Sequence, residues 1–270
     1  MIYGTAWKGD QTADLVAHAF EAGFRAFDTA AQPRHYREEL VGKGIRICVA
    51  KFGAKREDLY IQTKFLGLAG QGAGQEVPYD PASSLTEQVR TSIIGSLSNL
   101  APEEHLPLTQ VFIDCLILHA PFQRLEDTLS LQELQGLCQH VKIKPSVVQN
   151  AFHSGTKSDV DVRKFCVQNG IVYQAFSTLT ANPELLSSDF VSSLASEAGM
   201  ERAVALYYLI EKLENVNVLN GTTKAETMKR DLEQVLELKD WASSSSHAEE
   251  LAVITSQFRA YIGERDEGGT

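Results

Sequence analysis

The sequence has few cysteines, no excess of basic residues and no long hydrophobic run. Twenty-five basic and 35 acidic residues give a formal net charge of −10, which leaves no basic field to bind nucleic acid or an anionic membrane surface. There is no stretch of about eighteen apolar residues and no basic leader before the first apolar segment. We therefore expect a cytoplasmic protein with neither membrane nor nucleic-acid partners. Widely spaced cysteines without a Cys-x-x-Cys motif or a nearby histidine at zinc-ligand spacing predict reduced thiols and no metal site at Cys48, Cys115, Cys138 and Cys166.

What the sequence does have is a regular alternation of two patterns. Short β-branched or aromatic runs alternate with longer segments of helical periodicity along the 270 residues. This alternation is typical of βαβ units that build a parallel sheet, so the predicted fold class is α/β. Seven strands are predicted, at Ile2–Ala6, Arg25–Thr29, Leu59–Lys64, Val111–His119, Ser146–Asn150, Ile171–Ser177 and Val216–Asn220.

The helical segments carry apolar residues at intervals of three and four. Gly23 and Gly170 are expected to end two of these helices, because glycine readily adopts the left-handed conformation found there. A broader helical region is expected at Ser187–Lys212. The other predicted helices are Thr12–Ala22, Arg37–Ala50, Ser84–Leu100, Leu129–Gln139, Ser158–Asn169, Lys224–Leu238 and Ala248–Tyr261.

Length and strand number together favour a (β/α)8 TIM barrel that is incomplete. A chain of 270 residues suits one such barrel, but a closed barrel needs eight strands. The interval between His119 and Ser146 has room for one helix only, so about one βα unit is missing there. We expect the barrel over residues 1–240 and a C-terminal segment, a helix and a polar tail, over 241–270. The long loop Gly67–Pro81 follows the third strand, where such a barrel carries its working loops.

Polar side chains close several of the predicted strands. Asp28, Lys64 and His119 lie at the ends of the second, third and fourth strands, and Tyr36 follows Asp28 along the chain. Each residue alone has an ordinary structural explanation, such as a helix cap, a solvated strand end or a core histidine. Because the carboxyl ends of parallel strands meet at one face, all four together indicate a catalytic site.

The order of these segments resembles the aldo-keto reductases, a family of NAD(P)H-dependent (β/α)8-barrel oxidoreductases. The likeness runs from about Met1 to Asp240, and no one motif carries it alone. The segments concerned are Gly4-Thr5, Phe27-Asp28-Thr29-Ala30 followed by Tyr36, Ile61-Gln62-Thr63-Lys64-Phe65, Leu116-Ile117-Leu118-His119 and Val148-Gln149-Asn150.

The resemblance implies a role for each catalytic residue. Tyr36 would donate a proton to the carbonyl oxygen, and Lys64 would favour the phenolate by its positive charge. Asp28 would hold Lys64 in place, and His119 would orient the substrate oxygen. His35, next to Tyr36, is an alternative donor. An apolar carbonyl substrate is expected from the aromatic residues Trp7, Phe65 and Trp241.

The resemblance also implies cofactor contacts. Gln149 would contact the nicotinamide carboxamide, and Phe176, followed by Ser177, would stack on the ring. The expected cofactor is NADPH or NADH, with NADPH preferred, and no metal is expected. The remaining expected contacts are Gly4, Thr5, Asp28, Thr222 and Thr227.

Three departures from the family pattern affect these expectations. The family's fifth-strand Gly-x-Ser-Asn segment is missing. Glu126–Leu129 resembles the start of the family's fourth helix and Ser130–Leu134 resembles its fifth helix, so the two segments are joined directly where the strand should lie between them. The loop between Asp28 and Tyr36 is longer than in the family. Residues that bind the 2′-phosphate are replaced by Gly221, Thr222 and Thr227, with Lys224, Lys229 or Arg230 as displaced substitutes.

Three functions remain open from the sequence. The first is an NAD(P)H-dependent reductase of a small aldehyde or ketone. The second is a shortened, catalytically impaired or non-catalytic family member that no longer positions the cofactor. The third is an aldolase-type barrel in which Lys64 forms a Schiff base, which would need a lowered lysine pKa and is disfavoured by Asp28. The oligomeric state is left open.

Overall fold

The computed structural model describes residues 1–72, 74, 76–119 and 129–264. The chain divides into two compact units, and each is described by itself. The first unit comprises Met1–Asp127 and Asn220–Lys229, and the second comprises Thr128–Leu219 and Arg230–Thr270.

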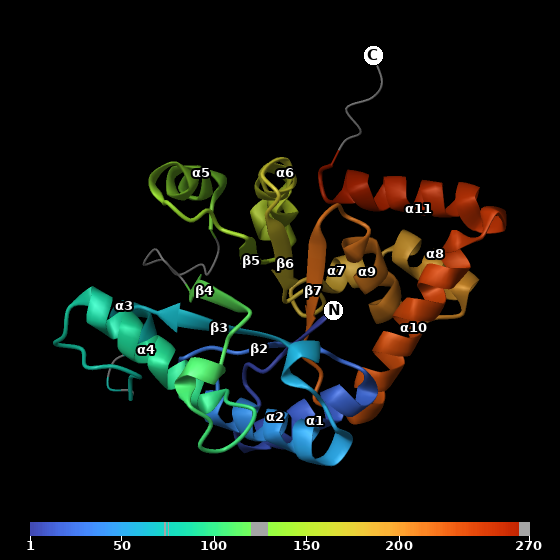
Figure 1. Ribbon diagram of the computed structural model, residues 1–270. Coiled ribbons are helices and arrows are strands. Elements are labelled where there is room, and N and C mark those ends of the chain that lie inside the picture. The colour runs from blue at the N-terminus through green and yellow to red at the C-terminus, as the bar shows by residue number, and fades with distance from the viewer. Residues whose placement is uncertain (73, 75, 120–128, 265–270) are drawn as a thin grey trace. The chain divides into compact units, whose positions relative to one another are not determined.

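The first unit contains a parallel sheet in the order β4-β3-β2-β1 (Figure 1). The register pairs Gly4 with Asp28, Asp28 with Gln62, and Leu66 with His119. The polar residues that follow the strands are thereby brought to one end of the sheet. The strands are β1 (Ile2–Gly4), β2 (Ala26–Asp28), β3 (Tyr60–Leu66) and β4 (Cys115–His119).

Helices α1 and α2 pack side by side in this unit (Figure 1). Gly44 of α2 permits the close approach, because a Cβ at this position would lie 2.6 Å from Cβ of Val16 on α1. Gly23 ends α1 in the left-handed conformation with φ 116°, as predicted. The helices are α1 (Thr12–Ala22), α2 (Glu38–Phe52), α3 (Leu68–Gln71) and α4 (Leu85–Asn99), with short 3-10 turns at Gly9–Gln11, Arg56–Asp58 and Leu108–Gln110.

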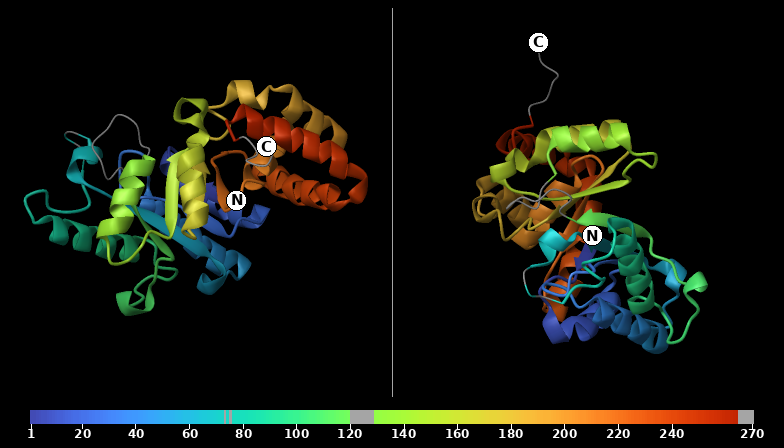
Figure 2. Two further views of the ribbon diagram at one scale, coloured as in Figure 1. Left: turned by 90° about the horizontal axis from the view of Figure 1, so that it is seen from above. Right: turned by 90° about the vertical axis from the view of Figure 1, so that its left-hand side faces the viewer.

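The second unit contains a second set of parallel strands in the order β7-β6-β5. These strands are β5 (Val147–Ala151), β6 (Val172–Phe176) and β7 (Val216–Asn220), of which Asn220 is assigned to the first unit. Figure 2 shows α11 lying along α8, where Phe190 contacts the rings of Phe258 and Tyr261. The remaining helices of the chain are α5 (Leu131–His140), α6 (Val160–Gln168), α7 (Pro183–Leu186), α8 (Asp189–Ala198), α9 (Arg202–Glu211), α10 (Ala225–Ser243) and α11 (Ala248–Tyr261), with 3-10 turns at Ser154–Asp159 and Ser245–His247.

All seven predicted strands are present, with ends that differ by a few residues. The region Ser187–Lys212 is resolved into α8 and α9, which Gly199 separates with φ 66°. The expected loop Gly67–Pro81 contains the short helix α3. The division into residues 1–240 and 241–270 stays a prediction, and α10 continues across that boundary to Ser243.

The interval between β4 and β5 is the place where a βα unit was expected to be missing. Its described part, from residue 129 to 146, contains α5 and no strand. Ser130 caps α5, since its hydroxyl accepts a hydrogen bond from the Glu133 amide while the Glu133 carboxylate accepts one from Ser130. The predicted join lies between Glu126–Leu129 and Ser130–Leu134, and of these two segments residues 126–128 lie outside the described residues.

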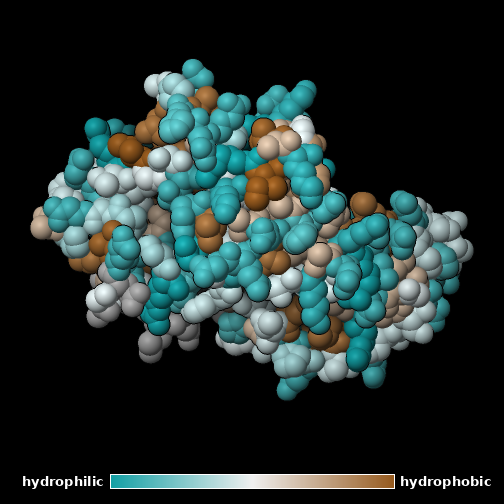
Figure 3. Space-filling view, turned by 90° about the horizontal axis from the view of Figure 1, so that it is seen from below, coloured by the Kyte–Doolittle hydropathy of each residue, from teal (hydrophilic) through white to brown (hydrophobic). Residues whose placement is uncertain are grey.

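The surface mixes polar and hydrophobic side chains. On the face shown in Figure 3, hydrophobic groups are interspersed among hydrophilic ones. Within the described ranges, no helix combines the length and hydrophobicity needed to cross a bilayer.

Candidate active site

The first unit brings Asp28 and Lys64 to the same face of neighbouring strands. Asp28 lies opposite Gln62 in the parallel register, and Lys64 follows Gln62 by two residues, so alternation places Gln62 and Lys64 on one face of β3. The segment that follows β2 stays paired with β3, because the amides of Thr29 and Ala31 donate to the carbonyls of Gln62 and Lys64, each at 3.0 Å. Backbone hydrogen bonds therefore fix the positions of Asp28 and Lys64.

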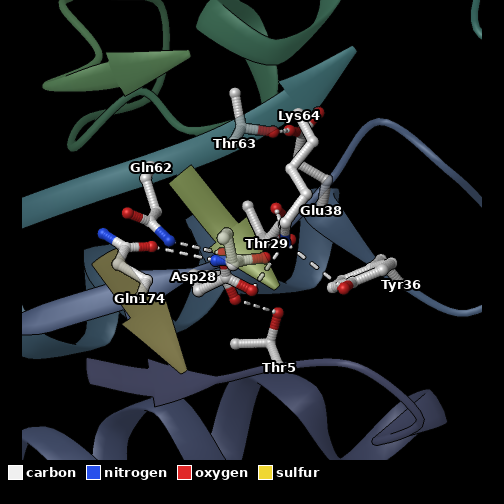
Figure 4. A network of polar contacts seen from close by, with 10 residues as sticks. Thr5, Asp28, Thr29, Tyr36, Glu38, Gln62, Thr63, Lys64 and Gln174 are labelled. Carbon is white, nitrogen blue, oxygen red and sulfur yellow. Dashed lines mark hydrogen bonds and ion pairs between the residues drawn. The ribbon is translucent and has the colours of Figure 1, made fainter. Parts of the chain in front are cut away.

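Asp28 and Lys64 form a buried, fully hydrogen-bonded ion pair (Figure 4). Lys64 Nζ lies 2.6 Å from Asp28 Oδ2 and also donates to the Thr29 carbonyl at 2.9 Å. Gln62 Nε2 donates to Asp28 Oδ1 at 2.6 Å. The side chains of Lys64 and Asp28 are only 1% and 3% exposed. At this burial, each charge depends on its partner for stabilisation.

The pKa of Lys64 is raised above its ordinary value. Burial acts to lower the pKa of Lys64, but the charges of Asp28 and Tyr36 and the hydrogen bonds to both side chains act in the opposite direction and prevail. The lysine is therefore held as an ammonium group. A Schiff-base lysine needs a lowered pKa, so the direction of this shift disfavours the aldolase-type alternative.

Tyr36 reaches the ion pair despite its long connecting loop. The turn between Gln32 and Tyr36 is closed by hydrogen bonds from the amides of His35 and Tyr36 to the Gln32 carbonyl, and α2 begins two residues after Tyr36. The phenol oxygen lies 3.3 Å from Lys64 Nζ, and Figure 4 marks this contact with a dashed line. The extra loop residues thus fold into a turn and leave the expected proximity intact.

His119 completes the predicted group from the end of β4. Its ring meets the Tyr36 ring edge-on, with centroids 6.4 Å apart and an interplanar angle of 86°. The His35 ring instead stacks against the Trp7 indole at 3.8 Å between centroids. All four predicted catalytic side chains are thus gathered within the first unit, while their chemical roles stay predictions.

The sequence analysis missed a second buried carboxyl in the same unit. Glu38, at the start of α2, is 5% exposed and accepts hydrogen bonds from Thr63 Oγ1 and from Asn99 Nδ2. Burial raises the pKa of Glu38, and the hydrogen bonds from Thr63, Asn99 and Ser96 partly oppose that rise. These contacts tie the start of α2, two residues after Tyr36, to β3 and α4. The feature of the sequence that could have identified Glu38 is its position two residues after Tyr36.

Trp7 and Phe65 do not both line this site. Phe65 is 4% exposed and packs against Tyr79, with ring centroids 5.7 Å apart. Strand alternation directs it to the face of β3 opposite Lys64, so its predicted place as a pocket wall is wrong. Trp7 is 72% exposed. In the second unit, Trp241 stacks on His247 at 4.0 Å.

Several predicted cofactor contacts also lie in the first unit. Thr5 is buried, and its hydroxyl donates to the Asp28 carbonyl at 2.8 Å, so it supports the strand end that carries Asp28. Gly4 precedes it at the end of β1. Thr222 accepts a hydrogen bond from the Lys224 amide at 3.3 Å, which forms a turn ahead of α10, and Thr227 lies in the first turn of that helix.

The predicted contacts of the second unit lie on β5 and β6. Gln149 Nε2 donates to Gln174 Oε1 at 3.0 Å, and the strand register places these glutamines side by side. Phe176 ends β6 and is half-buried, and Ser177 follows with φ 56°. Gln174 was not predicted, although period-two alternation back from Phe176 places it on the same face of β6.

Each unit by itself presents groups that suit one part of a nicotinamide dinucleotide. Thr223 and Lys224 are exposed ahead of a 19-residue helix, a setting that favours a phosphate group. The primary amides of Gln149 and Gln174 match the hydrogen-bonding groups of a carboxamide. Arg230, the guanidinium nearest to the start of α10 in sequence, lies 3.7 Å from Glu201 in an ion pair.

Sequence comparisons find similarity to aldo-keto reductases. The sequence model of the Aldo/keto reductase family matches residues 1–126, a range that includes the four predicted catalytic residues. The chain is 26% identical over 279 residues to the (1S)-1,7-diacetoxy-luvungin A aldo-keto reductase of Citrus sinensis, which covers 94% of this chain and 83% of that protein. It is 24% identical over 275 residues to the NAD(P)H-dependent 6'-deoxychalcone synthase of Glycine max, which covers 93% and 84%.

Solved structures share the fold. An aldo-keto reductase of Bombyx mori in complex with NADP matches with a TM-score of 0.69 and 18% identity over 96% of this chain and 88% of that chain. The match confirms the predicted (β/α)8-type barrel, which here has seven strands among the described residues. Taken together, the sequence matches show that the chain is similar to aldo-keto reductases, and the solved structures show that it shares their fold.

Proposed function

We propose that this chain reduces an aldehyde or ketone to an alcohol, with Tyr36 as the proton donor and a nicotinamide dinucleotide as the reductant. Carbonyl reduction with NAD(P)H is the general chemistry of its family. The observation that supports the proposal most directly is the chain of contacts from Asp28 to Lys64 at 2.6 Å and from Lys64 to the Tyr36 oxygen at 3.3 Å.

The charges around Tyr36 suit a proton donor. When the phenol gives its proton to the carbonyl oxygen of the substrate, negative charge develops on the Tyr36 oxygen. The Lys64 ammonium stabilises that charge, and in the buried site this attraction is stronger than in water. Asp28 keeps the ammonium charged and in place. We propose that His119, whose ring meets the Tyr36 ring edge-on, donates a hydrogen bond to the substrate oxygen.

The cofactor is proposed from the family and from the donors described above. When bound, the reduced nicotinamide supplies the hydride. We propose NADPH in preference to NADH, because Thr222 and Lys224 offer donors for an additional phosphate. The substrate proposed is a small carbonyl compound, and a cytoplasmic location stays a prediction from the sequence. The proposed cofactor contacts are Gly4, Thr5, Asp28, Gln149, Phe176, Ser177, Thr222 and Thr227.

A second candidate is an impaired family member that has lost cofactor binding. The observation in its favour is the described interval between β4 and β5, which contains α5 and no strand. In the family pattern that interval carries a polar pair that holds the carboxamide. The two candidates differ in one measurable property, which is the affinity for the dinucleotide.

A binding titration separates the two candidates. Purified chain is titrated with NADPH and separately with NADH, while tryptophan fluorescence and the melting temperature are followed. The reductase predicts saturable quenching and a raised melting temperature, since a ligand that binds only the folded state stabilises it. A folded chain that binds neither dinucleotide refutes the reductase and supports the impaired alternative.

A matched set of variants then tests the proton donor. Tyr36→Phe should lower kcat by about 10²–10⁴-fold on a panel of aldehydes, because general acid catalysis contributes about that much. Its affinity for NADPH should stay near that of the parent chain. Tyr261→Phe, in α11, removes a phenol from the second unit and should leave kcat unchanged. A loss of activity in His35→Gln with an active Tyr36→Phe would assign the proton to His35 instead.

A further inference from the structure

The strand β4 forms one edge of the sheet in the first unit. Among the described residues, β3 is the strand that pairs with β4, over five residue pairs from Gln62–Cys115 to Leu66–His119. In Figure 1, β4 (green) lies beyond β3 at the margin of this sheet. The side chains of Leu116 and Leu118 are 46% and 52% exposed.

The direction of the backbone groups follows from the hydrogen bonds of the neighbouring strand. Gln62 and Lys64 accept bonds from the segment after β2, so their backbone groups face β2, and those of Thr63 and Phe65 face β4. Thr63 pairs with Leu116. In a parallel pair this register turns Cys115 and Ile117 toward β3. The N–H and C=O groups of Leu116 and Leu118 therefore point to the open edge.

The sequence of β4 lacks the residues by which proteins usually prevent the pairing of edge strands. The segment Cys115-Leu116-Ile117-Leu118-His119 contains no lysine, no acidic residue and no proline. Natural edge strands are commonly protected by such residues, by bulges or by a covering helix. The backbone groups of Leu116 and Leu118 point to this edge, and the apolar side chains of both residues are exposed.

We propose that β4 is a self-association edge, at which a second copy of this chain pairs antiparallel to the first. A two-fold axis at Ile117 places Leu116 of one copy opposite Leu118 of the other. Both residues direct their backbone groups to the edge, so each of the two Leu116–Leu118 pairs exchanges two hydrogen bonds. The leucine side chains of each pair then meet on the exposed face.

The sequence of β4 is suited to pairing with itself. A two-fold axis places each residue opposite its mirror position, so a charged residue in the strand would bring like charges together or bury one against a leucine. The strand contains no charged residue, and its exposed face presents leucine to leucine. A contact between two five-residue strands is small for a protein interface, so we expect a weak dimer that depends on concentration.

Sedimentation velocity of the full chain across a wide concentration range tests this proposal. The parent chain should shift with concentration from 29.7 kDa toward twice that mass. Leu116→Lys and Leu118→Lys should each weaken the dimer at least about tenfold, which corresponds to about 1.4 kcal/mol. The matched control is Ile143→Lys, because Ile143 is 89% exposed in the second unit and far from β4 in sequence.

A cross-linking experiment tests the register itself and does not depend on lysine variants. In a Cys115→Ser, Cys138→Ser background, a mixture of Leu116→Cys and Leu118→Cys chains should form a disulfide-linked dimer under mild oxidation. Each variant alone places its cysteine opposite leucine, diagonal to its own counterpart and beyond disulfide range. Three results would overturn the proposal: a monomer at every concentration, a dimer insensitive to both lysine variants, or equal cross-linking in the single variants and the mixture.

Discussion

The Asp28–Lys64 pair permits a quantitative prediction for Asp28→Asn. Asparagine keeps an oxygen that accepts the Gln62 hydrogen bond, so the substitution removes the negative charge with little change in shape. Lys64, 1% exposed, then loses the interaction that opposes its desolvation. Removing one member of a buried ion pair costs about 3–5 kcal/mol.

The pH dependence of this loss follows from the same charges. Deprotonation of Lys64 sets an upper limit to the cost, about 1.36 kcal/mol for each pH unit below its ordinary pKa of about 10.4. That limit is about 4.6 kcal/mol at pH 7 and about 1.9 kcal/mol at pH 9. In the parent chain the raised pKa of Lys64 keeps its contribution to stability up to its ordinary pKa. The difference between the two proteins should therefore shrink as the pH rises from 7 to 9.

Urea unfolding at several pH values, followed by circular dichroism and by Trp7 fluorescence in a Trp241→Phe background, measures this difference. Asp114→Asn is the matched control, since Asp114 pairs with Arg56 at 2.7 Å in the same unit and is 25% exposed. An arginine stays charged throughout this range, so the control should show a smaller loss that does not change with pH. A loss below about 1 kcal/mol at pH 7 for Asp28→Asn, or one constant from pH 7 to 9, would refute the reasoning.

Three further predictions concern other groups. Burial raises the pKa of Glu38, so its contribution to stability is greatest below its ordinary pKa and is lost as the pH rises through its pKa in the folded protein. Glu38→Gln should therefore gain stability relative to the parent between pH 4 and pH 8, as measured by urea unfolding. Ser130→Ala removes the cap of α5 and should cost about 1 kcal/mol in the unfolding of the second unit, and an unchanged midpoint would contradict the capping role. Burial raises the pKa of Cys48 to about 11 and of Cys166 to about 12, so iodoacetamide at pH 8 should modify the half-buried Cys138 first, as peptide mass mapping would show.

Much of the fold was predictable because its signals are local. The strands are short segments rich in β-branched and aromatic residues, and Thr12–Ala22 and Ala248–Tyr261 were predicted with the bounds observed. The gathering of Asp28 and Lys64 followed from the rule that parallel strands share a carboxyl end. These inferences need only the chain order and the periodicity of each segment.

The parts that were missed depend on register and on side-chain direction. The pairing of Gln62 with Asp28 requires knowing which residues lie opposite each other on β2 and β3. The same holds for Gln149 and Gln174 on β5 and β6. Phe65 was misplaced because an aromatic residue next to Lys64 in sequence lies on the opposite face of the strand. Composition carries no information of this kind.

The first unit is built from two stretches of chain that are far apart in sequence, which affects the order in which it folds during translation. The hydroxyl of Tyr3 donates to the Thr222 carbonyl at 2.9 Å, across 219 residues of chain. During translation, the elements that carry Asp28, Tyr36, Lys64 and His119 leave the ribosome long before Thr222 does. The polar group at the strand ends can therefore assemble early on the nascent chain, whereas the contact between Tyr3 and Thr222 has to wait until residue 222 has been made.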